Sequence, residues 1–145
     1  MRSISALAVA VALLSAAPSE AAVVRLGIGA DYLVNDTGEF NLTIAVGTHV
    51  ARLIQVGARF GALVASSPNF FGVPVDLFAR ANLADARVYI ELLAGPWFYF
   101  VNPDPVHAHV AFGFGLHAGP VSFGLEAGYV TNDAIIGIRI AFALY

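Results

Sequence analysis

Eight segments in which apolar residues alternate with small or polar ones predict an all-β protein, an eight-stranded antiparallel up-and-down barrel. The clearest segment is 106–117, VHAHVAFGFGLH, where valine, phenylalanine and leucine alternate with histidine, glycine and alanine. Such a period of two places consecutive side chains on opposite faces of a strand. The composition agrees, because 59% of the 145 residues are hydrophobic and only 12% are charged, against roughly 25% charged in ordinary soluble domains.

The N-terminal residues have a pattern of their own. Arg2 precedes an apolar run over 4–17, which is followed by a proline and a small-residue cleavage site. This order predicts a secretory signal peptide over 1–21 that is removed, and a barrel domain over 22–145. The alternative is a buried N-terminal helix. The chain has no cysteine, which excludes a disulfide framework and a lipid-anchored cysteine.

The same alternation, interrupted by turn residues, places each element. We expect strands over 24–34, 39–50, 52–65, 75–83, 87–95, 106–117, 121–129 and 134–145. The segment 66–74, SSPNFFGVP, is expected to be a loop because it combines proline, asparagine and glycine. We expect an aromatic strand end at 97–100 and a second loop at 102–105.

Two kinds of barrel fit this alternation: a soluble one with the apolar face inward, and a transmembrane one with that face outward. Ten of the fourteen glycines lie on the polar faces, at positions 27, 29, 47, 57, 61, 113, 115, 124, 128 and 137. Small residues beside a few long ones suit the narrow, filled interior of an eight-stranded barrel. The opposite face is too continuous and bulky to fit inside it. We therefore predict a transmembrane barrel with the apolar face toward lipid.

The polar faces carry equal numbers of cations and anions. They are Arg25, Arg59, Arg80, Arg87 and Arg139, and Asp31, Glu39, Asp76, Glu91 and Glu126. Buried charges are costly unless they are paired, so this balance predicts an ion-pair network that closes the lumen. Arginine without lysine fits this interpretation, because a guanidinium can bond two carboxylates. The alternative role of the mid-height charges is the gate of a narrow pore.

Connection lengths suggest an orientation. Minimal turns are expected near residues 51, 85 and 119, while the connections near 35, 68, 103 and 132 include the two longest. Short periplasmic turns and longer external loops are typical of outer-membrane barrels, so both termini are expected on the periplasmic side. An aromatic girdle is then predicted at the outer end, formed by Tyr32, Phe70, Phe71, Trp97, Tyr99 and Tyr129.

The last strand contains Gly137-Ile138-Arg139-Ile140-Ala141-Phe142. This segment resembles the terminal-strand signal that the barrel-assembly machinery reads. The whole chain after the signal peptide resembles the small eight-stranded outer-membrane β-barrel proteins, the porin-like transmembrane-barrel group of Gram-negative bacteria. The resemblance implies a location in the cell outer membrane, contact with outer-membrane lipid, and recognition by the assembly machinery through Gly137, Ile140 and Phe142. We expect a monomer.

Few residues offer chemistry. His107 and His109 share a strand face roughly 7 Å apart, a spacing at which two imidazoles can share a metal, but they are more simply polar lumen residues. The only serines after residue 21 are Ser66, Ser67 and Ser122, and none has a histidine two residues away on its own strand face. We therefore expect no cofactor, no metal and no enzymatic activity.

Charge also bears on the partner class. Removal of residues 1–21, which include Arg2 and Glu20, leaves six arginines, nine acids and no lysine. This balance argues against a nucleic-acid partner.

Three hypotheses follow. The first is a structural or surface-interaction barrel with a closed lumen. The second is a narrow or gated pore for small solutes, and the third is a soluble periplasmic barrel that binds an apolar ligand.

Overall fold

A computed structural model of the chain describes residues 22–35, 37–66, 69–85, 87–101 and 103–144. The predicted signal peptide lies outside these residues. The eight strands are β1 (Val23–Leu33), β2 (Thr37–His49), β3 (Ile54–Ser66), β4 (Asn69–Leu83), β5 (Val88–Tyr99), β6 (Val106–Ala118), β7 (Val121–Val130) and β8 (Asp133–Leu144).

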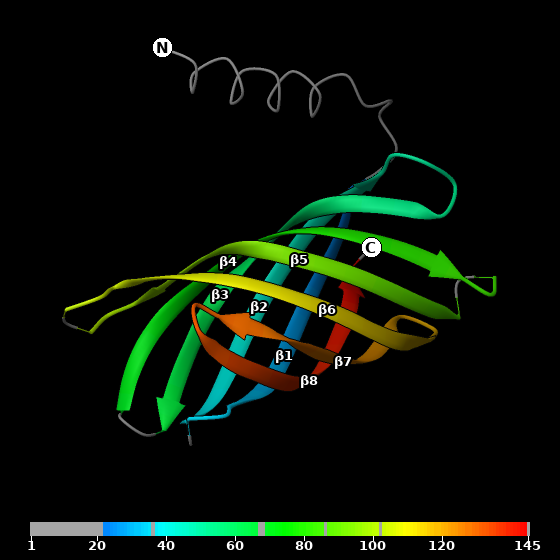
Figure 1. The fold of residues 1–145 in the computed structure, drawn as a ribbon. Helices are drawn as coiled ribbons and strands as arrows, with labels where there is room; N and C mark the ends of the chain where they lie inside the picture. Colours follow the sequence, from blue (N-terminus) through cyan, green and yellow to red (C-terminus); the bar gives the residue numbers. More distant parts are fainter. Residues whose placement is uncertain (1–21, 36, 67–68, 86, 102, 145) are drawn as a thin grey trace, which may run out of the picture.

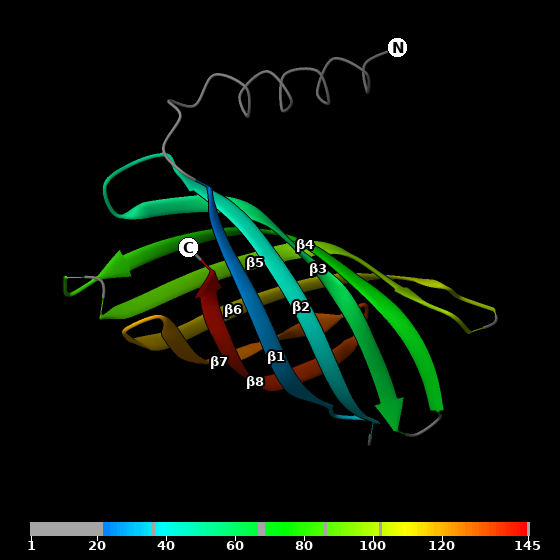
Figure 2. The ribbon, with the colours of Figure 1, turned by 180° about the vertical axis from the view of Figure 1, so that it is seen from behind.

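The strands form one closed barrel in sequence order, with every neighbouring pair antiparallel. Closure comes from β1, which pairs with β2 on one side and with β8 on the other. Figures 1 and 2 show the strands inclined steeply around the barrel, with the start of β1 beside the end of β8. The predicted fold class is confirmed.

The outward face is apolar along all eight strands. Leu77 is 69% exposed and Leu92 is 61% exposed, and phenylalanines and isoleucines on the other strands are also largely uncovered. A continuous apolar surface of this kind marks a site of contact with lipid or with a partner rather than with water. The apolar face that the sequence predicts for each strand is therefore the outward face of the barrel.

The prediction of a loop over 66–74 is wrong. Only two residues separate the end of β3 at Ser66 from the start of β4 at Asn69, and Phe70 to Pro74 belong to β4. Pro74 is tolerated because it lies in a gap of the β3–β4 ladder, between the pairs Phe60–Val75 and Leu63–Gly72, where no donor is required of it.

The predicted asymmetry in connection length is therefore wrong. At the end that carries the termini, the connections are 50–53, 84–87 and 119–120. At the opposite end they span 34–36, 67–68, 100–105 and 131–132, so only one of the four is long. Connection length thus gives no orientation to this barrel.

Candidate functional site in the lumen

A chain of ion pairs crosses the lumen at mid-height, and we call it the ion-pair chain. Its members are Asp31, Arg59, Asp76, His109, Glu126 and Arg139. Antiparallel register places Arg59 directly opposite Asp76 on the neighbouring strand. Arg139 on β8 reaches diagonally to Glu126 on β7 and to Asp31 on β1, because glycines stand directly opposite these three side chains. The links Arg59–Glu126 and Asp76–His109 join strands that are not neighbours.

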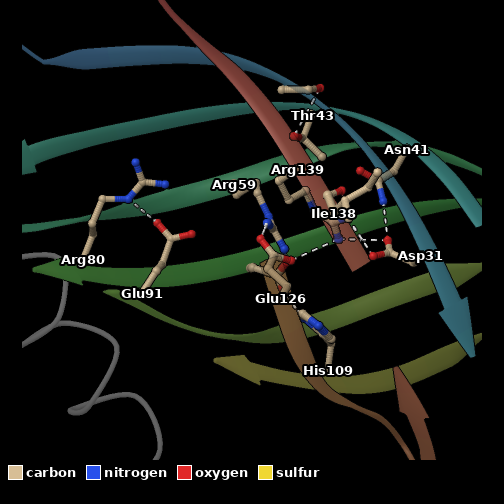
Figure 3. Close-up of polar contacts among 12 residues, drawn as sticks. Asp31, Asn41, Thr43, Arg59, Arg80, Glu91, His109, Glu126, Ile138 and Arg139 are labelled. Atoms are coloured by element: carbon tan, nitrogen blue, oxygen red, sulfur yellow. Dashed lines mark hydrogen bonds and ion pairs between the residues drawn. The ribbon is translucent and has the colours of Figure 1, made fainter. Parts of the chain in front are cut away.

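Glu126 is the centre of the ion-pair chain. Its carboxylate accepts from Arg59 Nη1 at 2.5 Å and lies 3.0 Å from Arg139 Nη2. Arg139 also forms an ion pair with Asp31, whose Oδ1 lies 2.6 Å from Arg139 Nη1. Asn41 Nδ2 donates to Asp31 Oδ2 at 2.5 Å. Figure 3 shows Glu126 between the two guanidinium groups.

Asp76 anchors the other end of the ion-pair chain and has no exposed surface. One of its oxygens lies 2.7 Å from His109 Nδ1, and the other accepts from Arg59 Nη2 at 2.9 Å. Trp97 Nε1 donates to the same carboxylate at 3.2 Å. This carboxylate is therefore bonded from three directions, which compensates for its complete burial.

The lumen toward the termini holds a second polar group, which we call the arginine pocket. It consists of Arg25, Gln55, Phe78, Arg80, Tyr89 and Glu91. Arg80 donates to Glu91 at 2.7 Å, while Arg25 donates to the neutral Gln55 at 2.6 Å. The guanidinium of Arg25 lies 5.3 Å from the centre of the Phe78 ring, and that of Arg80 lies 4.0 Å from the Tyr89 ring.

The prediction that Arg87 belongs to the ion-pair network of the lumen is wrong. It lies in the turn between β4 and β5 and is exposed, because β5 begins only at Val88. The described strands therefore bury four arginines against five carboxylates. Glu39 is buried in the lumen as predicted, but its carboxylate forms no ion pair with any described residue.

The end of the lumen away from the termini is closed by apolar side chains, which we call the apolar cap. Its buried members are Leu33, Leu63, Trp97, Tyr99, Val130 and Ile135. Phe70 packs against it, with its ring 4.8 Å from that of Tyr99. The Trp97 ring also stacks on the imidazole of His109 at 4.3 Å, which joins the apolar cap to the ion-pair chain.

Half of the predicted aromatic girdle is therefore wrong. Trp97 and Tyr99 are 1% and 4% exposed and face the lumen, and Phe70 packs inward with them. The reason is that β5 continues through Gly95 and Pro96 without losing its alternation, so Trp97 keeps the inward parity of Glu91. Three predicted members do face outward, namely Tyr32, Phe71 and Tyr129.

The two histidines proposed as a weak metal candidate have separate partners. His107 contacts Thr131 Oγ1 at 3.1 Å and the backbone oxygen of Asp104 at 2.9 Å, whereas His109 contacts Asp76. Within the described residues, no group of three or more His, Cys, Asp and Glu side chains is arranged to hold a metal ion.

The register also brings together a serine and a histidine that the sequence analysis did not pair. Ser122 on β7 lies directly opposite His117 on β6. However, the Ser122 hydroxyl donates to the backbone oxygen of Ala141 at 3.4 Å, and His117 Nε2 lies 3.3 Å from Asn82 Oδ1. The two side chains face the same side of the barrel wall but use other partners.

A small cavity of about 30 Å³ remains between the arginine pocket and the ion-pair chain. This volume holds about two water molecules. The lumen at this level is thus filled by side chains rather than by a continuous water column.

Solved structures give the context for this geometry. A structure described as a de novo design of transmembrane β-barrels matches with a TM-score of 0.68 and 12% identity, over 84% of this chain and 95% of that one. The fold is that of small transmembrane β-barrels.

Two natural proteins show the same architecture. The N-terminal β-barrel domain of Pseudomonas aeruginosa OprF matches with a TM-score of 0.57 and 11% identity, over 84% of this chain and 97% of that domain. Neisserial surface protein A, NspA, matches with a TM-score of 0.52 and 9% identity, over 85% of this chain and 94% of that protein. At these identities the likeness concerns the fold alone.

Sequence comparisons add no family. The chain matches no protein-family model and no curated protein. In the part of the chain that the structure describes, no helix is long and apolar enough to cross a membrane.

Proposed function

We propose that this protein is an outer-membrane β-barrel with a closed, ion-paired lumen and a structural or surface-interaction role. One observation carries the proposal: the lumen is filled at two successive levels, by the ion-pair chain and by the apolar cap. The continuous apolar exterior supports insertion in a bilayer, because a closed barrel leaves no unpaired sheet edge in lipid.

The terminal strand supports assembly in the outer membrane. Phe142 is 43% exposed on the outward face of β8, and Gly137 lies on the inward face opposite Asp31. We propose that the assembly machinery recognises this strand through Gly137, Ile140 and Phe142. The barrel is proposed to act as a monomer, with outer-membrane lipid around it.

Catalysis is not part of the proposal. The facing pair Ser122 and His117 has its polar atoms engaged with Ala141 and Asn82, and no mutual hydrogen bond activates the serine. We expect no esterase or lipid-deacylase turnover by the folded protein.

Planar-bilayer recording tests the closed lumen. We expect the reconstituted wild-type protein to show no stable, wide conductance, because both filled levels block the path. A variant that combines Arg59→Ala and Arg139→Ala with Leu63→Ala and Trp97→Ala, and so shortens side chains at both filled levels, serves as the control for an opened lumen. A stable wide conductance in the wild type would overturn the proposal and support the narrow or gated pore.

Cell fractionation tests the membrane location separately. Recovery of the protein in the outer-membrane fraction, with a band that shifts on a gel after boiling, is the expected result. Recovery in the soluble fraction without detergent would instead support a periplasmic barrel that binds an apolar ligand.

A further inference from the structure

The arginine pocket contains more positive than negative charge. Arg80 is paired with Glu91, but Arg25 donates its side-chain hydrogen bond to the neutral Gln55, and no carboxylate of the described residues lies within ion-pair distance of Arg25. Gln55 lies directly opposite Arg80 on the neighbouring strand, and both arginines line the same cavity. The arginine pocket thus holds two cations but only one carboxylate, and that carboxylate is paired with Arg80 alone.

Both arginines are buried and incompletely bonded. Arg25 and Arg80 are 7% and 6% exposed. Among the described residues, neither Arg25 Nη2 nor Arg80 Nη1 has a hydrogen-bond partner. Figure 3 shows Arg80 bonded to Glu91 through one nitrogen, with the rest of its guanidinium directed away from that carboxylate. An unpaired buried charge is costly, so the pocket favours a ligand of opposite charge.

The cavity beside these arginines sets the size of that ligand. Its volume is about 30 Å³, and Arg25, Arg80, Phe78 and Tyr89 are among its lining residues. A space for about two water molecules accommodates a monatomic anion. An organic anion such as gluconate is far too large for it. Arg59, Glu126 and Arg139 also border the cavity, so the ion-pair chain lies between it and the apolar cap. An ion therefore enters from the end that carries the termini.

We propose that this cavity binds a small inorganic anion of the chloride class, held between the guanidinium groups of Arg25 and Arg80. The anion neutralises Arg25 and completes the bonding of both side chains. The site goes beyond the proposed structural role and does not require conduction, because the ion-pair chain and the apolar cap close the lumen beyond it.

Equilibrium unfolding in urea tests the site in solution. The full barrel, folded in detergent, is compared in chloride and in gluconate at equal ionic strength. At a chloride concentration about twice the dissociation constant, the folded-to-unfolded ratio should rise about threefold. Arg25→Gln should abolish the difference between the salts, Arg25→Lys should retain part of it, and the exposed-turn variant Arg87→Gln should leave it intact. Equal stability of the wild type in both salts, or an unchanged chloride effect in Arg25→Gln, would overturn the proposal.

Bromide in crystals of the wild type gives a measurement that needs no variant. We expect an anomalous peak in the cavity beside Arg25. Bromide found only at exposed positions such as Arg52, with none in the cavity, would overturn the proposal. Neither result bears on conductance, so failure of the anion site and failure of the closed lumen are separately observable.

Discussion

The apolar cap and the ion-pair chain fill adjacent levels of the same lumen with side chains of opposite character. The cap excludes water by packing, with Leu63 at 0% and Trp97 at 1% exposure. The ion-pair chain has similar burial, but each charge depends on a named partner, as Arg59 and Arg139 depend on Glu126. The cap should therefore respond to lost volume, and the ion-pair chain to a lost charge.

The largest effect is expected from Glu126→Ala. This change removes the carboxylate that Arg59 and Arg139 share and leaves two buried cations with one partner each. We expect a loss of about 3–5 kcal/mol in the free energy of unfolding, measured by urea titration in lipid vesicles. Asp104→Ala, at an exposed position before β6, is the matched control. A loss as small as that of the control would show that the ion pairs do not hold this level together.

Leu63→Ala tests the apolar cap. Because Leu63 is fully buried among cap side chains, its truncation leaves a cavity, and we expect a loss of about 2–5 kcal/mol in the same titration. Leu77→Ala, on the outward face, removes the same atoms where lipid can fill the space, so its effect should be smaller. Equal losses in the two variants would mean that the cap is not tightly packed.

Much of the fold and most of the lumen charges could be predicted from the sequence. The period of two predicted all eight strands, the barrel and the inward placement of nine of the ten charged residues assigned to the lumen. It succeeds because side chains in a strand alternate strictly, so one clear stretch such as 106–117 sets the parity of its strand.

The apolar cap was missed although the same rule contains it. Leu33, Leu63 and Ile135 have the same odd-numbered parity as the inward-facing charges on their own strands. The inward face of these strands therefore changes from polar to apolar toward the end of the barrel away from the termini. The polar faces were described in the sequence analysis by their charges and glycines alone, so the apolar residues on the same faces were not considered together. Partner choice was also not predictable, since the links of the ion-pair chain that span several strands depend on barrel curvature.

Trp97→Phe probes the junction between the two levels. The change keeps an aromatic ring in the cap but removes the indole N–H that donates to Asp76. A hydrogen bond to a charged group is worth about 1.5–3 kcal/mol, and we expect a loss in this range. A double-mutant cycle with Asp76→Asn isolates the bond from the smaller ring. Strictly additive losses would show that the cap and the ion-pair chain are energetically independent.

The smallest effect is expected from Arg87→Gln, which distinguishes lumen charge from total charge. Arg87 lies in the exposed turn before β5, so its removal changes the net charge of the protein without uncovering a buried partner. We expect the free energy of unfolding to change by no more than about 0.5 kcal/mol. If Arg87→Gln instead destabilised the barrel as strongly as Glu126→Ala, the balance of charge over the whole protein, rather than the pairing of each buried charge, would determine the stability of the lumen.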